Sequence, residues 1–326
     1  MTDFKTQSSH VNVPLPYHHK GKLLWDGVGV AVHPAWDRST IMQRAGQDYI
    51  VETARLFMYD QHKPGPIEVP GVQAIRRTYP KGNEVRVLGK AGARYQPIQN
   101  SVMYDVADLL VKNGKANYCN AGTALGGRYA WVIVQLVSAY KVAHGDFVDE
   151  YLLILNNHNG KGSMKILFTP VHVNTHTVLF APDRARPRIT HSGGLCWDFR
   201  NADGLWKMCQ RVFTKAGRVY SKMHERKLRM PTDASDFFNK ALPRGKGIHG
   251  THRMRIQASL HRLYREKIRS SGEYSLWAAY NAVMEYLDHV RLSCRTQEGR
   301  LIRGLIEDVP RRRAKVLKAA TNFMRS

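Results

Sequence analysis

Lysine and arginine side chains are the groups of this chain best placed to do chemistry, and they are concentrated in its second half. Residues 184–326 contain 31 basic and 12 acidic residues, a net charge of +19, whereas residues 1–183 contain 19 and 14, a net charge of +5. A cationic side chain beside a phosphate releases condensed counterions and gains affinity, whereas unpaired charge opposes compaction. The distribution therefore predicts a nucleic-acid partner bound by the C-terminal half.

The predicted phosphate contacts come from two basic helices and two glycine-rich segments. They are Arg253, Arg255, Arg262, Arg265, Lys267 and Arg269 in the first helix, Arg311, Arg312, Arg313 and Lys315 in the second, Lys246 in a glycine-rich loop, and Arg128 after Gly126 and Gly127. Because glycine has no Cβ, a backbone containing it can approach a phosphate closely. A solvated helix face is the alternative for each cation, and the size of the charge excess favours phosphate binding.

Two aromatic residues of the N-terminal half, Tyr95 and Trp131, are predicted to stack on bases. Each base stacked on an aromatic ring contributes about 1–3 kcal/mol without sequence readout. The alternative for each is a place in the core. Together with the predicted cations, these two rings predict a protein that binds single-stranded DNA in recombination or replication. We expect no cofactor.

The histidines suggest a second hypothesis, a metal-dependent enzyme that processes nucleic acid. His172 and His176 are four residues apart, and His158 precedes them. A metal site needs a further ligand, such as Asp183 or Asp198, and a two-metal nuclease needs several carboxylates close together. Acidic residues are few, so we assign no catalytic residue and no metal ligand. A third hypothesis is a structural protein whose charge binds an acidic protein surface.

Cysteine usage and hydropathy bear on the surroundings of the chain. None of its four cysteines forms a CxxC pair, which predicts reduced thiols in a cytoplasm. No apolar run approaches the roughly 20 residues that cross a bilayer, and no secretory signal is recognisable. We therefore expect a cytoplasmic protein without a membrane partner; a homo-oligomer is compatible with the sequence.

The order of expected strands and helices predicts an α+β fold, and these elements must position the side chains named above. The fold has an antiparallel, sheet-centred N-terminal part and a helical, strongly basic C-terminal part. We expect a mobile arm over residues 1–20, a mixed α/β sheet domain over 21–183, and a basic helical region over 184–326 packed on or beside the sheet. Residues 130–138, 149–155 and 163–169 predict an antiparallel meander, with the Asn159-Gly160 turn between the last two. Residues 27–32 and 85–88 predict strands, and 50–57 could form a helix or a strand.

Apolar spacing predicts helices over residues 101–115, 203–223, 253–269, 275–292 and 311–324. Ser101 is expected to cap the first of them, and Gly114 to end it. Residues 229–250 contain two prolines and several glycines and predict an exposed loop.

The chain resembles a family found on phages and plasmids, the domain of unknown function number 932. The resemblance rests on four blocks: residues 87–100 with Tyr95-Gln96-Pro97, Gly126-Gly127-Arg128 with Trp131, residues 151–171 with His158-Asn159-Gly160 and Thr169-Pro170-Val171, and residues 280–289. The chain departs from the family pattern where Asn159 replaces an Asp, His172 an Arg, and Thr177-Val178 an Asn-Thr pair. The resemblance implies a mobile-element origin and no particular reaction; a likeness to single-strand annealing proteins is an analogy of fold alone.

Overall fold

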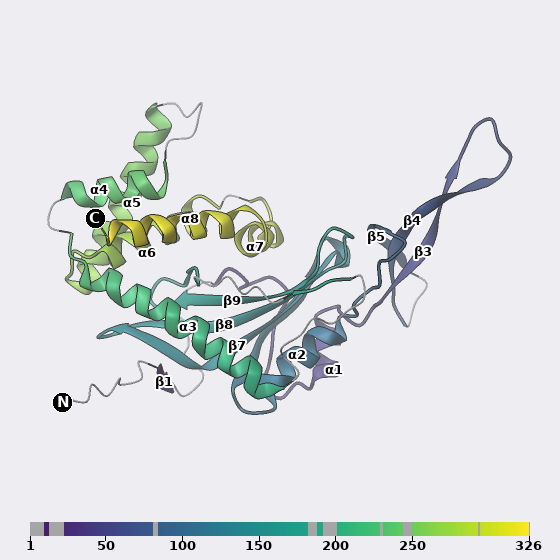
Figure 1. Ribbon diagram of the computed structural model, residues 1–326, viewed down its shortest axis with the longest axis horizontal. Coiled ribbons are helices and arrows are strands. Elements are labelled where there is room, and N and C mark those ends of the chain that lie inside the picture. The colour runs from purple at the N-terminus through teal and green to yellow at the C-terminus, as the bar shows by residue number, and fades with distance from the viewer. Residues whose placement is uncertain are drawn as a thin grey trace.

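The computed structural model describes residues 10–12, 23–80, 84–181, 188–191, 201–228, 231–243, 250–292 and 294–325 (Figure 1). It confirms the predicted α+β class. Strands dominate up to β11 (Arg188–Ile189), and every described element after it is a helix or helical turn.

An eight-stranded antiparallel sheet forms the centre of the molecule. Its main path runs β10 (Thr177–Val178), β9 (Met164–His172), β8 (Asp146–Asn157), β7 (Tyr129–Ala143), β6 (Ala116–Ala124) and β2 (Val30–Ala31); β1 (His10–Asn12) pairs with β7, and β11 with β9. The predicted meander is confirmed as β7, β8 and β9, whose β-branched and aromatic residues suit a pleated, buried surface. The strand predicted over residues 27–32 is only the two residues of β2.

Successive side chains of β8 serve two different hydrophobic cores, because they point to opposite faces of the sheet. Leu153 and Leu155 pack with the C-terminal helices, whereas Leu152 and Ile154 pack with α2 (Ser101–Val111) and the start of α3. The sheet and the helices that follow it in sequence therefore share cores.

The C-terminal helices are α3 (Ala202–Glu225), α4 (Pro231–Ala241), α5 (Gly250–Ser271), α6 (Leu276–Glu285), a π-helical turn (Tyr286–Val290), α7 (Gln297–Leu305) and α8 (Asp308–Phe323). Three of them begin at side-chain caps: Asn201, Ser275 and Thr296 accept hydrogen bonds from backbone N–H groups of the first turn. The predicted helices are confirmed.

The prediction of an exposed loop over residues 229–250 was wrong, because these residues include α4. Ala234, Phe237, Phe238 and Ala241 are buried, and their spacing of three, one and three residues places them on one helical face. Pro231 is the first residue of the helix, where its missing N–H costs nothing.

The N-terminal cap of α2 also differs from the prediction. Asn100, not Ser101, is the cap residue, and its side chain makes no capping bond. It donates instead to the Gln47 carbonyl, at 3.1 Å. The predicted end is confirmed: Gly114 has φ of 63°, and its N–H donates to the Val111 carbonyl at 3.0 Å.

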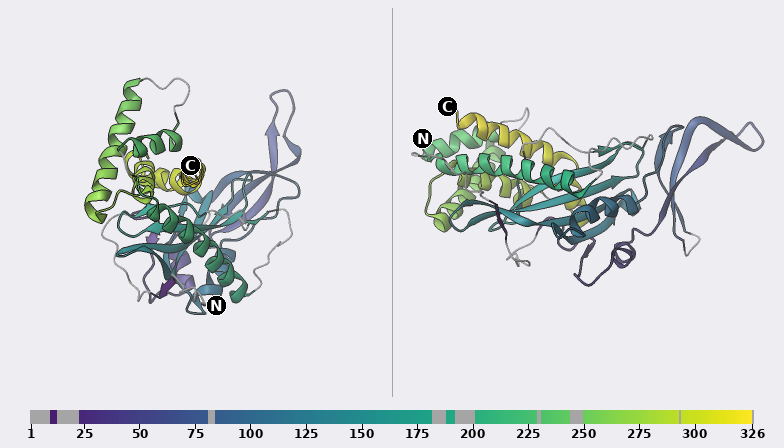
Figure 2. Two further views of the ribbon diagram at one scale, coloured as in Figure 1. Left: turned by 60° about the vertical axis from the view of Figure 1, so that its left-hand side comes forward. Right: turned by 60° about the horizontal axis from the view of Figure 1, so that its bottom comes forward.

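A three-stranded sheet projects from one end of the molecule as an arm (Figures 1 and 2). It consists of β3 (Ile50–Tyr59), β4 (Pro66–Thr78) and β5 (Val85–Gly92), in that order. The ambiguous segment 50–57 is thus a strand, and the strand predicted over 85–88 is confirmed. The helices α1 (Arg38–Arg44) and α2 lie near the base of the arm (Figure 1).

Candidate nucleic-acid interface

A row of cations follows the outer face of α3. Its members are Lys207, Arg211, Lys215, Arg218, Lys222 and Arg226, all of them exposed. Their spacing of three or four residues keeps them on one side of the helix, and at about 1.5 Å per residue the row is about 28 Å long. We call these six residues the α3 row.

The opposite face of α3 fixes the direction of the row. Val212, Phe213, Ala216 and Tyr220 are buried in the cores. Gly217 lies so close to β7 that a Cβ there would be 2.3 Å from the ring of Tyr140. This tight packing directs the six cations to solvent.

No member of the α3 row forms an ion pair in the described part of the chain. Arg211, Lys215, Arg218 and Lys222 border a shallow hollow of about 560 Å³ on the outside of the helix. Free cations that border an open depression can approach a polyanion without first losing another partner.

The predicted contacts on α5 divide into two groups. Arg255, Arg262, Arg265 and Arg269 are exposed. Arg253 instead joins α5 to α4, donating to the Leu242 carbonyl at 2.6 Å and to the side chain of Asn239. Lys267 is paired with Glu285 of α6. We therefore assign these two cations to helix packing and keep the four exposed arginines as candidates.

The C-terminal ends of α3 and α5 meet. Lys227 follows α3 and pairs with Glu273, which follows α5; the Leu228 N–H donates to the Tyr274 carbonyl at 2.8 Å. The side chain of Tyr274 is 59% exposed at this meeting point. An exposed aromatic ring thus lies near the ends of two basic helices, and neither Tyr274 nor the α3 row was among the predicted contacts.

Arg313 is a correction to the predicted contacts on α8. It is 2% exposed; its guanidinium is 2.5 Å from Asp288 and donates to the Gly304 carbonyl at 2.6 Å. Asp288 also accepts from the Val178 N–H at 2.9 Å. Arg313 therefore links α8 to α7 and β10 and cannot reach a phosphate outside. Arg311 and Lys315 are exposed, and Arg312 pairs with Asp308 at 3.2 Å.

Trp131 is a second correction. It is 1% exposed, and its indole N–H donates to Asn120 at 2.8 Å, so the ring belongs to the core and cannot receive a base. Tyr95 is half-buried and stacks on His191, with ring centroids 4.8 Å apart. Arg128 is exposed, and Lys246 lies outside the described residues.

Blocks that are far apart in the sequence meet where the arm joins the main sheet. The His158 N–H donates to the Arg128 carbonyl at 2.8 Å, and its imidazole Nε2 is 2.9 Å from Asn100 Oδ1. A Cβ at Gly89 would be 2.4 Å from the Asn159 carbonyl oxygen. The first three blocks that carry the family resemblance thus form one packed junction.

Two neutral histidines lie in this junction. Burial lowers the pKa of His158 to about 3, helped by the neighbouring His191, and lowers the pKa of His191 to about 4. Their ring centroids are 6.0 Å apart. Both rings are uncharged near neutral pH, so His191 does not supply a cation for phosphate.

His158 and His172, two of the histidines in the metal-site hypothesis, do not converge. His172 lies 2.5 Å from Asp146 and 2.7 Å from Thr175 Oγ1, opposite Val148 near the start of β8. His158 follows the end of β8, and nine residues of strand separate these positions, or about 30 Å. Among the residues described, no group of three or more His, Cys, Asp or Glu could hold a metal ion.

Comparison with known proteins yields one match. The model of a family described as Domain of unknown function (DUF932) matches residues 87–318. No curated protein and no solved structure matches the chain. Within the described ranges, every helix is too short or too polar to cross a membrane.

Proposed function

The chain belongs to the DUF932 family, and we propose that it binds nucleic acid, holding a single strand of DNA along α3 and the end of α5. The observation that carries this proposal is the α3 row. Six exposed cations, none of them in an ion pair among the residues that the structure describes, lie on one face of a helix whose other face is buried in the cores. A phosphate backbone is a partner with a matching line of charge.

Backbone binding of this kind gives little sequence preference, because phosphates are the same at every position. Arg265 and Arg269, exposed near the C-terminal end of α5, extend the proposed basic surface, since this end meets the end of α3 at the Lys227–Glu273 pair. Arg311 and Lys315 of α8 are further exposed cations that could add affinity without adding selectivity.

Tyr274 is the feature that favours a single strand over a duplex. Its ring is 59% exposed and adjoins the ends of both basic helices. Unpaired bases can stack on such a ring, whereas bases inside a duplex are already stacked on one another. Tyr274 therefore takes the place of Trp131 as the proposed stacking residue, and Tyr95 is a weaker candidate because His191 already covers one face of its ring.

Fluorescence anisotropy with a labelled oligothymidine and a labelled duplex tests the proposal. We expect binding whose affinity falls as salt rises, and tighter binding of the single strand. Tyr274→Ala should weaken single-strand binding by about 5- to 150-fold, the equivalent of 1–3 kcal/mol, and leave duplex binding nearly unchanged. Tyr274→Phe, which keeps the ring, is the matched control. Absence of binding to DNA and RNA at low salt would refute the proposal.

A role in recombination or replication is the finer part of the proposal. Proteins that hold strands by the backbone can leave base edges free for pairing. Faster annealing of complementary oligonucleotides by the protein, lost when the α3 row is neutralised, would support this role. Preference for DNA over RNA, self-association and a phage origin stay predictions.

A further inference from the structure

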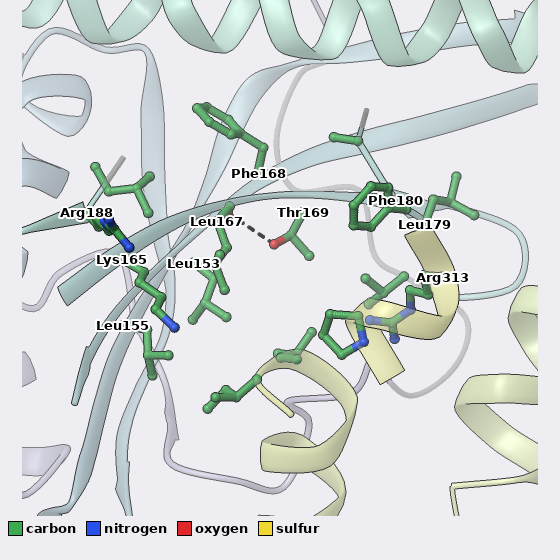
Figure 3. Close-up of a pocket in the computed structure, with 16 residues that line it drawn as sticks. Leu153, Leu155, Lys165, Leu167, Phe168, Thr169, Leu179, Phe180, Arg188 and Arg313 are labelled. Atoms are coloured by element: carbon green, nitrogen blue, oxygen red, sulfur yellow. Dashed lines mark hydrogen bonds between the residues drawn. The ribbon is translucent and has the colours of Figure 1, made fainter. Parts of the chain in front are cut away.

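A cavity of about 280 Å³ lies between the sheet and the last two helices (Figure 3). Leu153 and Leu155 of β8 and Leu167 of β9 line the sheet side, and Leu305, Ile306 and Pro310 of the α7–α8 region line the opposite side. Phe168 and Phe180 also contribute to the wall. The interior is therefore predominantly apolar.

Cations lie at both ends of the cavity, and among the described residues those at one end have no partner. Figure 3 shows Lys165 and Arg188 close together at one end and Arg313 at the other. Lys165 of β9 and Arg188 of β11 lie opposite each other in the register of the two strands. Neither forms an ion pair or side-chain hydrogen bond in the part of the chain that the structure describes. Arg313 is already paired with Asp288.

Lys165 is unusual because of the face from which it projects. In the alternation of β9 it belongs with Leu167 and Thr169, which line the same cavity. It is partly buried beside Leu155, its partner on β8. A lysine on an apolar face without a carboxylate is favourable when a bound anion lies beside it.

The walls of the cavity favour an anion with an aliphatic chain over a nucleotide. A nucleobase presents several polar edge atoms, and burying them without hydrogen bonds is costly. Thr169 supplies the one side-chain hydroxyl among the lining residues, and it already donates to the Leu167 carbonyl at 3.2 Å. An aliphatic chain needs no such partners and gains from contact with the leucines.

We infer that this cavity binds an amphiphile: an aliphatic chain between the leucines, with an anionic head group on Lys165 and Arg188. The head group is a carboxylate or a phosphate monoester, since both accept hydrogen bonds from a lysine and an arginine. The site is separate from the α3 row and does not depend on nucleic-acid binding.

Isothermal titration of the full-length protein with decanoate, decyl phosphate, decanol and thymidine monophosphate tests the inference. We expect one decanoate or decyl phosphate per chain, and binding of decanol and the nucleotide at least 10-fold weaker. Lys165→Gln should weaken binding of the two anions by about 10- to 100-fold, because it removes one charge-assisted contact. It should leave decanol unaffected.

Two further variants make the result decisive. Ile306→Trp, which fills the cavity from a half-buried position, should abolish binding of both anions while the melting temperature shows that the chain is folded. Lys161→Gln, at an exposed lysine outside the cavity, should bind as wild type. Each of four results would overturn the inference. They are equal binding of decanoate to wild type and to Ile306→Trp, equal affinity of wild type for decanoate and decanol, tighter binding of thymidine monophosphate than of decanoate, and no binding of either aliphatic anion.

Discussion

Neutralising the middle of the α3 row should remove most of the DNA affinity of this protein. The variant carries Arg211→Gln, Lys215→Gln, Arg218→Gln and Lys222→Gln, all at exposed positions without ion pairs in the described residues. For single strands, the slope of log affinity against log salt is about 0.7 per phosphate contact. Four lost contacts should reduce the slope by about 2.8 and, at about 0.1 M salt, the affinity by about 600-fold.

Anisotropy titrations of a labelled oligothymidine between about 0.05 and 0.3 M salt measure both quantities. The matched control replaces Lys63, Arg86, Lys90 and Arg94, exposed cations of the arm and of the residues just after it that form no ion pair in the described residues, with glutamine. This control changes the net charge by the same amount but should lower the slope by less than the value of one phosphate contact, about 0.7. A slope unchanged in the α3 variant, or lowered equally in both variants, would refute the assignment. Circular dichroism and melting temperature verify folding, since exposed substitutions usually change stability by about 0.5 kcal/mol or less.

The buried pair of Arg313 and Asp288 should be structural: Arg313→Met should destabilise the fold by about 3–5 kcal/mol in urea unfolding, because it leaves Asp288 buried without its partner, whereas the exposed neighbour Arg311→Met should not. Gly217→Ala should lower the free energy of unfolding by about 1–3 kcal/mol, because its Cβ would overlap the Tyr140 ring. Equal stability of Gly217→Ala and wild type in urea unfolding would contradict this packing. Stability should fall as pH decreases from about 6.5, because the unfolded chain then takes up protons that His158 and His191, with pKa values of about 3 and about 4, do not bind when folded. The loss is on the order of 2 kcal/mol for His158 at about pH 5, and His158→Gln should flatten the urea-measured pH profile by that amount.

Much of the fold could be predicted from local pattern. The meander β7–β9 follows from β-branched runs and an Asn-Gly turn, and α3 follows from apolar residues at helical spacing. The family could be identified from short blocks because they include glycines and polar residues at positions where backbones meet, as at Gly89 and Asn159. α4 was missed because proline and glycine signals around it outweighed the helical spacing of its four buried residues.

The candidate interface was predicted only in outline. The excess of basic residues identifies the C-terminal half, but charge counts do not distinguish Arg311, which is exposed, from Arg313, which is buried two positions later. The α3 row is visible in the sequence as cations three or four residues apart, once the apolar face of the helix is known. Tyr274 carries no local signal, since its place near two basic helices depends on how α3 and α5 meet.

Periodicity by itself determined the fold class and most of the helices and strands, because these follow from interactions between residues near one another in the chain. Composition by itself determined the sign of the net charge. Tertiary packing decided which cations face solvent, that the ring of Tyr274 is exposed beside two basic helices, and that His158 and His172 lie near opposite ends of β8. The physical reason is that burial and pairing depend on contacts between distant segments. The same arginine is a surface charge or a buried link according to whether another element covers it.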